Sequence, residues 1–125
     1  AGVSVIVRNS DISDLIAWQR AFALGLSVYR LTNSFPDGER FGLIAQLRRG
    51  GISVASNIAE GWGRGSTADY IRFLKVARGA LYEVDTQLLF SVELGYAKSE
   101  SYSEIKSLLN ETERVLAGLI KSLER

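Results

Sequence analysis

The sequence has no cysteine, no histidine and only one proline, Pro36, among its 125 residues. Without cysteine it forms no disulfide and carries out no thiolate chemistry, and nothing points to an oxidising compartment. Without histidine it lacks the usual ligands of zinc and di-iron sites, the Ser-His triad and the commonest general base. We therefore expect no metal site, no cofactor and no enzymatic activity.

Long uninterrupted apolar runs are also missing. The apolar patch from Val3 to Val7 spans five residues and has no charged region before it, so it is too short for a signal peptide or a membrane span. We expect a cytoplasmic protein with no membrane association. We also expect residues 1–10 to form a flexible tail before a single domain at residues 11–125.

The composition is that of a folded globular domain, with 46% apolar and 23% charged residues. The net charge is only +1, but it is unevenly distributed. Residues 39–78 carry seven basic and three acidic side chains, whereas residues 79–125 carry five basic and eight acidic ones. The middle of the chain can therefore present a basic face, although most charge clusters of this size are ordinary solvated surface.

Four segments show apolar residues in steps of three and four, the spacing of one helical face. We predict helices that begin near residues 11–14, 36–37, 66 and 101, and the first three end near residues 32, 61 and 95. The predicted inward-facing stripes are Leu15, Trp18, Phe22, Leu26 and Tyr29 in the first; Ile44, Leu47, Gly51, Val54 and Ile58 in the second; Tyr70, Leu74, Ala77, Leu81, Val84 and Leu88 in the third; and Ile105, Leu108, Thr112, Val115, Leu119 and Leu123 in the fourth.

Turn and capping residues separate these segments. Ser66 and Ser101 are each followed three residues later by a carboxylate, as in a capping box. The Gly50-Gly51 pair within the second segment indicates a close helix approach, a kink, or sequence variation without a structural role. Four helices of this length with short connections predict an all-α, antiparallel up-and-down four-helix bundle.

The second helix also carries a polar stripe opposite its apolar one. The small side chains of Ser53 and Ser56 lie between Arg49 and Glu60, which would allow another helix to approach closely. Asn57 and Glu60 are candidates for a hydrogen-bonded network with Arg64 or with a neighbouring subunit. The alternative, an exposed polar turn, fits equally well.

Three stretches resemble a known family: DLIAWQRAFALGLSVYRLTNSFP at 14–36, LRRGGISVASNIAEGWGRGS at 47–66 and YIRFLKVARGALYEVDTQLL at 70–89. They are similar to the bacterial four-helix-bundle proteins of 23S ribosomal RNA intervening sequences, with SNIAEG at 56–61 the most specific part. The sequence departs from the family pattern at Gly50-Gly51 and at Ala55.

The resemblance implies a four-helix protomer that commonly forms a homopentameric ring. It also implies a relationship to the accessory protein of diversity-generating retroelements, a basic pentamer thought to bind nucleic acid and a reverse transcriptase. The residues expected at an oligomer interface are Ser53, Ser56, Asn57, Glu60, Gly61 and Trp62.

Two hypotheses follow. In the first, an oligomer binds structured RNA through a basic surface made of Arg48, Arg49, Arg64, Arg72, Lys75 and Arg78, repeated in each subunit. In the second, the oligomer is a scaffold that binds another protein and no nucleic acid. Its arginines would then pair with carboxylates such as Glu60 or Glu83.

Overall fold

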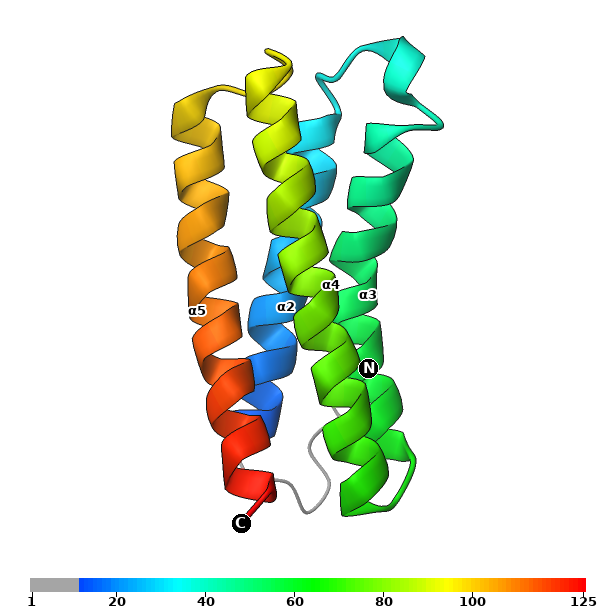
Figure 1. Cartoon of the computed structure of the whole chain (residues 1–125), viewed down its shortest axis with the longest axis vertical. Coiled ribbons are helices and arrows are strands. Elements are labelled where there is room, and N and C mark those ends of the chain that lie inside the picture. Colours follow the sequence, from blue (N-terminus) through cyan, green and yellow to red (C-terminus); the bar gives the residue numbers. More distant parts are fainter. Residues whose placement is uncertain (1–11) are drawn as a thin grey trace.

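The computed structural model describes residues 12–125, which form four long helices joined by short connections (Figure 1). The helices are α2 (Ile12–Thr32), α3 (Leu43–Gly63), α4 (Thr67–Glu93) and α5 (Ser99–Leu123), with a short 3-10 helix, η1 (Asp37–Glu39), between α2 and α3. The tail expected at residues 1–10 lies outside the described residues.

The helices are arranged as an up-and-down bundle. Each packs against two others, with contacts between α2 and α3, α3 and α4, α4 and α5, and α5 and α2. Successive helices run in opposite directions (Figure 1), so α2 and α4 run parallel to each other. The described part of the chain contains no strand. The predicted all-α four-helix bundle is therefore confirmed, while assembly into a ring stays a prediction.

The apolar stripes of α3 and α4 face the core as expected. Every predicted residue of the α4 stripe is buried, and so are four of the five in α3, with Ile44 partly buried. In α5 half of the predicted stripe is buried, namely Ile105, Thr112 and Leu119, and the other half is partly buried. Leu109, Leu116 and Ile120 are buried beside it, so the buried face is shifted from the predicted one.

The stripe predicted for α2 is wrong. The residues that α2 buries include Ala17, Ala21, Leu24 and Val28, while Phe22, Leu26 and Tyr29 remain exposed. Two of these buried side chains, Ala17 and Ala21, are small, and at Gly25 α2 lies very close to α3. A Cβ on Gly25 would lie 3.1 Å from the carbonyl oxygen of Gly51.

The glycine pair in α3 makes two close approaches, as one of the sequence interpretations proposed. Gly51 packs against Gly25 and Val28 of α2, and a Cβ on Gly50 would lie 2.8 Å from Val84 Cγ2 of α4. Side chains at these two positions would push α3 away from both neighbours.

Two predicted helix starts need correction. The second long helix begins at Leu43 and not near residue 36, because η1 and a turn come first. The Glu39 carboxylate then accepts a hydrogen bond from the Leu43 amide at 3.0 Å. The last helix begins at Ser99 and not at Ser101, so the proposed capping box lies inside it. The cap at Ser66 is confirmed, since its hydroxyl accepts from the Asp69 amide at 3.1 Å.

Candidate functional site

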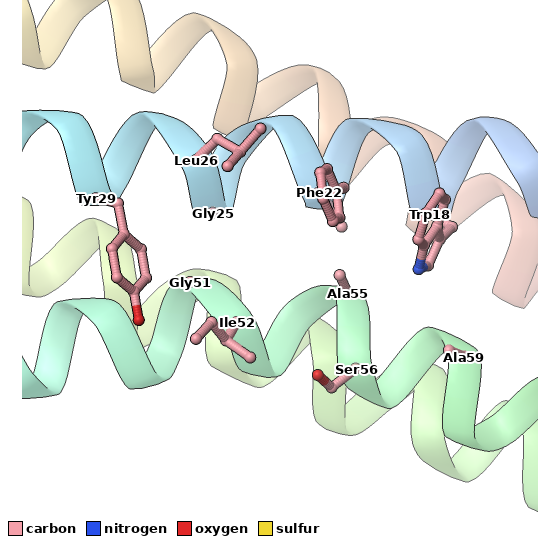
Figure 2. A pocket seen from close by; sticks show the side chains of 11 residues that line it. Trp18, Phe22, Gly25, Leu26, Tyr29, Gly51, Ile52, Ala55, Ser56 and Ala59 are labelled. Carbon is pink, nitrogen blue, oxygen red and sulfur yellow. The ribbon is translucent and has the colours of Figure 1, made fainter. Parts of the chain in front are cut away.

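An apolar groove runs along the outside of the bundle between α2 and α3 (Figure 2). Its α2 wall consists of Trp18, Phe22, Leu26 and Tyr29, and its α3 wall of Ile52, Ala55, Ser56 and Ala59. We call this surface the α2–α3 groove. It encloses about 460 Å³ and has no charged residue in its lining.

The groove results from the unequal sizes of the residues on its two walls. Gly25 and Gly51 let the helices meet at one point, and the small Ala55 and Ala59 line α3 on one side of that contact. The aromatic side chains of α2 project over this shallow wall, as Figure 2 shows for Trp18 and Phe22. The rings of these two residues lie 5.3 Å apart.

Much of this apolar surface is open to solvent. The exposed fractions are 48% for Phe22, 41% for Leu26, 38% for Tyr29 and 49% for Ile52. Isolated exposed apolar residues are common on soluble proteins, but a contiguous apolar groove is typical of an interaction site. The groove is therefore the main candidate for a binding surface.

Most of the predicted interface residues lie elsewhere. Ser56 lines the groove, whereas Ser53 lines a separate polar crevice between α3 and α4. The Asn57 amide donates to the Ser53 carbonyl at 2.8 Å and to its hydroxyl at 2.9 Å, so it is satisfied within α3. Glu60 pairs with Arg64 at 3.5 Å. The structure thus brings only one of the six, Ser56, into the groove.

Gly61 and Trp62 pack within the bundle. Gly61 is buried, and a Cβ there would lie 2.6 Å from Phe73 Cβ of α4. Trp62 meets the ring of Tyr70 edge-on, with 5.8 Å between centroids. Both residues help to join α3 to α4.

Among the predicted basic residues, Arg48 stabilises the C-terminal end of α2. Its Nε donates to the Thr32 hydroxyl at 2.8 Å and its Nη2 to the Asn33 side chain at 3.0 Å. Its guanidinium also stacks on the Tyr29 ring, 4.6 Å from the centroid. These contacts fix the side chain beside one end of the groove.

A second group of basic residues lies near the α3–α4 turn. The guanidinium groups of Arg64 and Arg72 lie 5.2 Å and 4.5 Å from the Phe73 ring, and both form long ion pairs with Asp69. Lys75 pairs with Glu124 of α5 at 2.8 Å. Exposed pairs of this kind contribute about 0–1 kcal/mol each, so a stronger anion can displace them.

Arg49 and Arg78 form no ion pair with any described residue. Arg49 is exposed and lies at the polar crevice between α3 and α4, which Glu83 also lines. Of the two carboxylates that the scaffold hypothesis named, Glu60 pairs with Arg64 within the protomer, whereas Glu83 forms no ion pair with a described residue. The six predicted basic residues are distributed over α3, α4 and the turn between them, in different local surroundings.

Two polar contacts, one buried and one partly buried, hold the helices in register. The Tyr70 hydroxyl donates to Asp14 Oδ1 at 2.6 Å, and burial together with this hydrogen bond raises the pKa of Tyr70. The Lys106 ammonium donates to Asp85 Oδ2 at 2.6 Å, and this contact raises the pKa of Lys106. These groups join different helices and line none of the crevices described above.

Two further features of residues 12–125 concern ligands and membranes. No three acidic side chains gather there into a group that could hold a metal ion. No helix in this part of the chain is long and apolar enough to cross a bilayer.

Comparison with known proteins decides the family. The sequence profile of the 23S rRNA-intervening sequence proteins matches residues 13–118, which is most of the chain and all of α3 and α4. The chain belongs to this family. The profile confirms the resemblance that the three sequence stretches indicated, and it includes both walls of the groove.

A solved structure supports the fold. The chain is similar to a protein of unknown function from the S23 ribosomal protein family of Bacteroides thetaiotaomicron, with a TM-score of 0.81 and 24% sequence identity. The similarity covers 87% of this chain and 98% of the other. At this identity the likeness establishes a shared fold. No curated protein matches the sequence.

Proposed function

We propose that this protein is a non-enzymatic interaction protein that assembles with copies of itself through the α2–α3 groove. The observation that supports this most is the exposure of Phe22, Leu26, Tyr29 and Ile52 along one continuous, uncharged surface. Charged residues are depleted and aromatic residues enriched at the centres of protein interfaces, and the groove has both properties. This is the scaffold hypothesis with its interface moved from the polar stripe of α3 to the groove.

The size of the groove fits a helix from a partner. Trp18 and Tyr29 are eleven residues apart on α2, so the wall between them extends for about 16 Å at 1.5 Å per residue. An amphipathic helix can place two or three side chains over this length. The groove alone is smaller than a standard interface of roughly 800 Å² per partner, so neighbouring surfaces must contribute as well.

The substitution Phe22→Glu tests this proposal. A charge at the centre of an apolar interface costs about 3 kcal/mol or more, which is roughly a hundredfold in the association constant. We expect sedimentation velocity to show a multimer for the wild type and a smaller species for the variant. Phe22 is 48% exposed, so the fold should persist, as circular dichroism can verify.

The matched control is Phe41→Glu. Phe41 is 89% exposed and lies in the turn before α3, away from the groove. This variant makes the same chemical change at a more exposed site and should sediment like the wild type. Equal sedimentation of Phe22→Glu and the wild type would contradict assembly through the groove.

A second candidate function is RNA binding by the assembled protein. It is supported by Arg49 and Arg78, which form no ion pair with a described residue, and by the weak surface pairs of Arg64 and Arg72. Repetition of these residues in each subunit would add avidity, and binding would weaken steeply with salt.

A structured RNA added at 50 mM and at 200 mM salt tests this second function. We expect binding at the lower salt only, and weaker binding by the Arg49→Ala and Arg78→Ala variants. Absence of binding near 50 mM salt would favour a scaffold that binds protein alone.

A further inference from the structure

The α2–α3 groove starts close to the point where α2 begins. The helix begins at Ile12, and Trp18, the first aromatic residue of the groove, comes six residues later. Six residues of helix extend about 9 Å. At this same end, the aromatic side chains of α2 stand over the small Ala55 and Ala59 of α3 (Figure 2). Residues 1–11, which precede α2 in the sequence, are therefore attached beside one end of the groove.

The sequence before α2 contains a segment whose chemistry suits this groove. Residues 3–7 read VSVIV and include no charged side chain, and the lining of the groove has none either. Four of these five residues are β-branched and apolar, a composition that favours an extended backbone. The segment can therefore cover exposed aromatic surface without burying a charge.

We propose that residues 3–7 bind the α2–α3 groove of their own chain in an extended conformation, and that a second copy must displace them in order to assemble. This inference rests on the proposed self-assembly and adds a means of regulating it. The segment and the second copy compete for one surface.

The lengths of the segment and of the groove agree. Five extended residues span about 16 Å, which is also the length of the α2 wall from Trp18 to Tyr29. Residues 8–11 join the segment to α2 and can span up to about 13 Å. This is more than the distance of about 9 Å along the helix from Ile12 to Trp18. The segment can therefore reach the groove while α2 stays as it is.

The connection requires the chain to reverse its direction, because α2 runs from its own N-terminus along the groove. Residues 9–11 are Asn, Ser and Asp, which favour turns because their side chains can form hydrogen bonds with nearby backbone. The segment then runs antiparallel to α2, with Val7 beside Trp18.

The alternation of an extended chain decides which side chains enter the groove. Side chains two residues apart point to the same side. Val3, Val5 and Val7 therefore face the groove, while Ser4 and Ile6 lie on the opposite side of the segment. A charge placed at position 5 would enter the groove, and a charge at position 4 would not.

The charges at the two ends of the groove favour the same direction. Arg8 follows the segment directly and comes to the end of the groove that is lined by Ala59. Glu60 is the next residue of α3, and its side chain is 54% exposed. At the opposite end, the guanidinium of Arg48 lies on the Tyr29 ring and would repel a second arginine.

Attachment to α2 gives the segment an advantage over a separate molecule. A short linker produces an effective concentration in the millimolar range, whereas a second copy binds at its free concentration. The second copy can displace the segment only by adding contacts outside the groove. Assembly is therefore weakened in proportion to the fraction of molecules whose groove is already filled.

The fluorescence of Trp18 tests this binding directly. Trp18 is only partly buried by α2 and α3, and Trp62→Phe makes it the sole tryptophan. In that background, at a concentration where light scattering gives one protomer, we expect Val5→Asp to shift the Trp18 emission to longer wavelength. Quenching by acrylamide should increase as well. Unchanged emission and quenching would overturn the inference.

The matched control is Ser4→Asp, which adds the same charge one residue away, on the side that faces away from the groove. It should keep the emission and the quenching of the unsubstituted chain. A synthetic peptide of residues 1–8, added to the Val5→Asp variant, should restore both. Equal effects of Ser4→Asp and Val5→Asp would contradict the extended binding proposed here.

Light scattering over a range of concentrations tests the competition. If the segment fills the groove in roughly nine molecules of ten, Val5→Asp should lower the dissociation constant of the assembly about tenfold. Ser4→Asp should assemble like the wild type. Weaker assembly of Val5→Asp would show that the segment joins different copies, and it would overturn the inference.

The outcomes separate this inference from the proposed function. If Phe22→Glu lowers the mass while Val5→Asp changes neither the mass nor the Trp18 emission, the inference fails alone. If every variant stays a single protomer at all concentrations while Val5→Asp still shifts the emission, the segment binds the groove and the proposed self-assembly fails.

Discussion

Removing a single hydroxyl group by Tyr70→Phe tests how α2 is fixed to α4. The Tyr70 hydroxyl donates to Asp14 at 2.6 Å, and the Asp14 side chain is 5% exposed. A hydrogen bond to a charged group contributes about 1.5–3 kcal/mol, and its loss leaves the carboxylate buried without this donor. We expect the free energy of unfolding to fall by about 2–3 kcal/mol at pH 7.

The same substitution predicts a pH dependence. The pKa of Tyr70 is raised in the folded protein by burial and by the Asp14 hydrogen bond, whereas the unfolded chain has a pKa near 10. The stabilisation is therefore complete below about pH 10 and decreases as the pH rises above it, because only the unfolded state loses the proton. The difference in the free energy of unfolding between wild type and variant should shrink by about 1.4 kcal/mol per pH unit above pH 10.

Urea unfolding followed by circular dichroism from pH 7 to 11 measures both effects. The control is Tyr82→Phe, since Tyr82 is exposed and its hydroxyl meets Glu113 at 3.2 Å. That variant should differ from wild type by less than about 0.5 kcal/mol. The reasoning would be refuted if Tyr70→Phe lowered the free energy of unfolding by less than about 0.5 kcal/mol at pH 7. It would also be refuted if the difference between wild type and Tyr70→Phe stayed constant up to pH 11.

Two further predictions concern the packing of α3. Gly61→Ala should lower the free energy of unfolding by about 1–3 kcal/mol, because the new Cβ would lie 2.6 Å from Phe73 Cβ. Gly63→Ala should leave it unchanged, because there is open space around a Cβ at that position. Thermal unfolding compares the two, and equal melting temperatures would show that α3 and α4 have room to move apart. Arg48→Ala should cost about 1–2 kcal/mol through the loss of its hydrogen bonds at the end of α2. Arg49→Ala should stay within about 0.5 kcal/mol, and an equal loss in both variants would contradict a special role for Arg48.

The fold could be predicted from the sequence because four helices with clear apolar stripes have few ways to bury them. The α4 stripe was unambiguous, since it alternates steps of four and three without interruption. The start of α3 was not predictable to within a turn. The sequence after Pro36 suits a helix, but it first forms η1 and a turn. The Leu43 amide then donates to the Glu39 carboxylate where α3 begins.

The inward side of α2 was predicted wrongly for a physical reason. Phe22, Leu26 and Tyr29 form the more apolar of its two stripes, and a pattern based on side-chain size selects them. The core instead takes Ala17 and Ala21, because α2 must lie close to its neighbours. Which of two stripes faces inward depends on the opposing helix, and the sequence of α2 alone does not contain that information.

The sequence analysis missed the candidate site for the same reason. The exposed stripe of α2 forms the groove, and Ser56 was the one predicted interface residue that lies in it. The sequence did contain a signal for the groove. The α2 segment carries both a small-residue stripe and an aromatic stripe, and the core of the bundle buries only one of them.

Self-assembly through the groove is tested most directly by the mass of the wild-type protein, measured by light scattering during size exclusion over a range of concentrations. We predict a mass that is a multiple of the 13.7 kDa protomer and that Phe22→Glu lowers. A wild-type mass of 13.7 kDa at every concentration would contradict it.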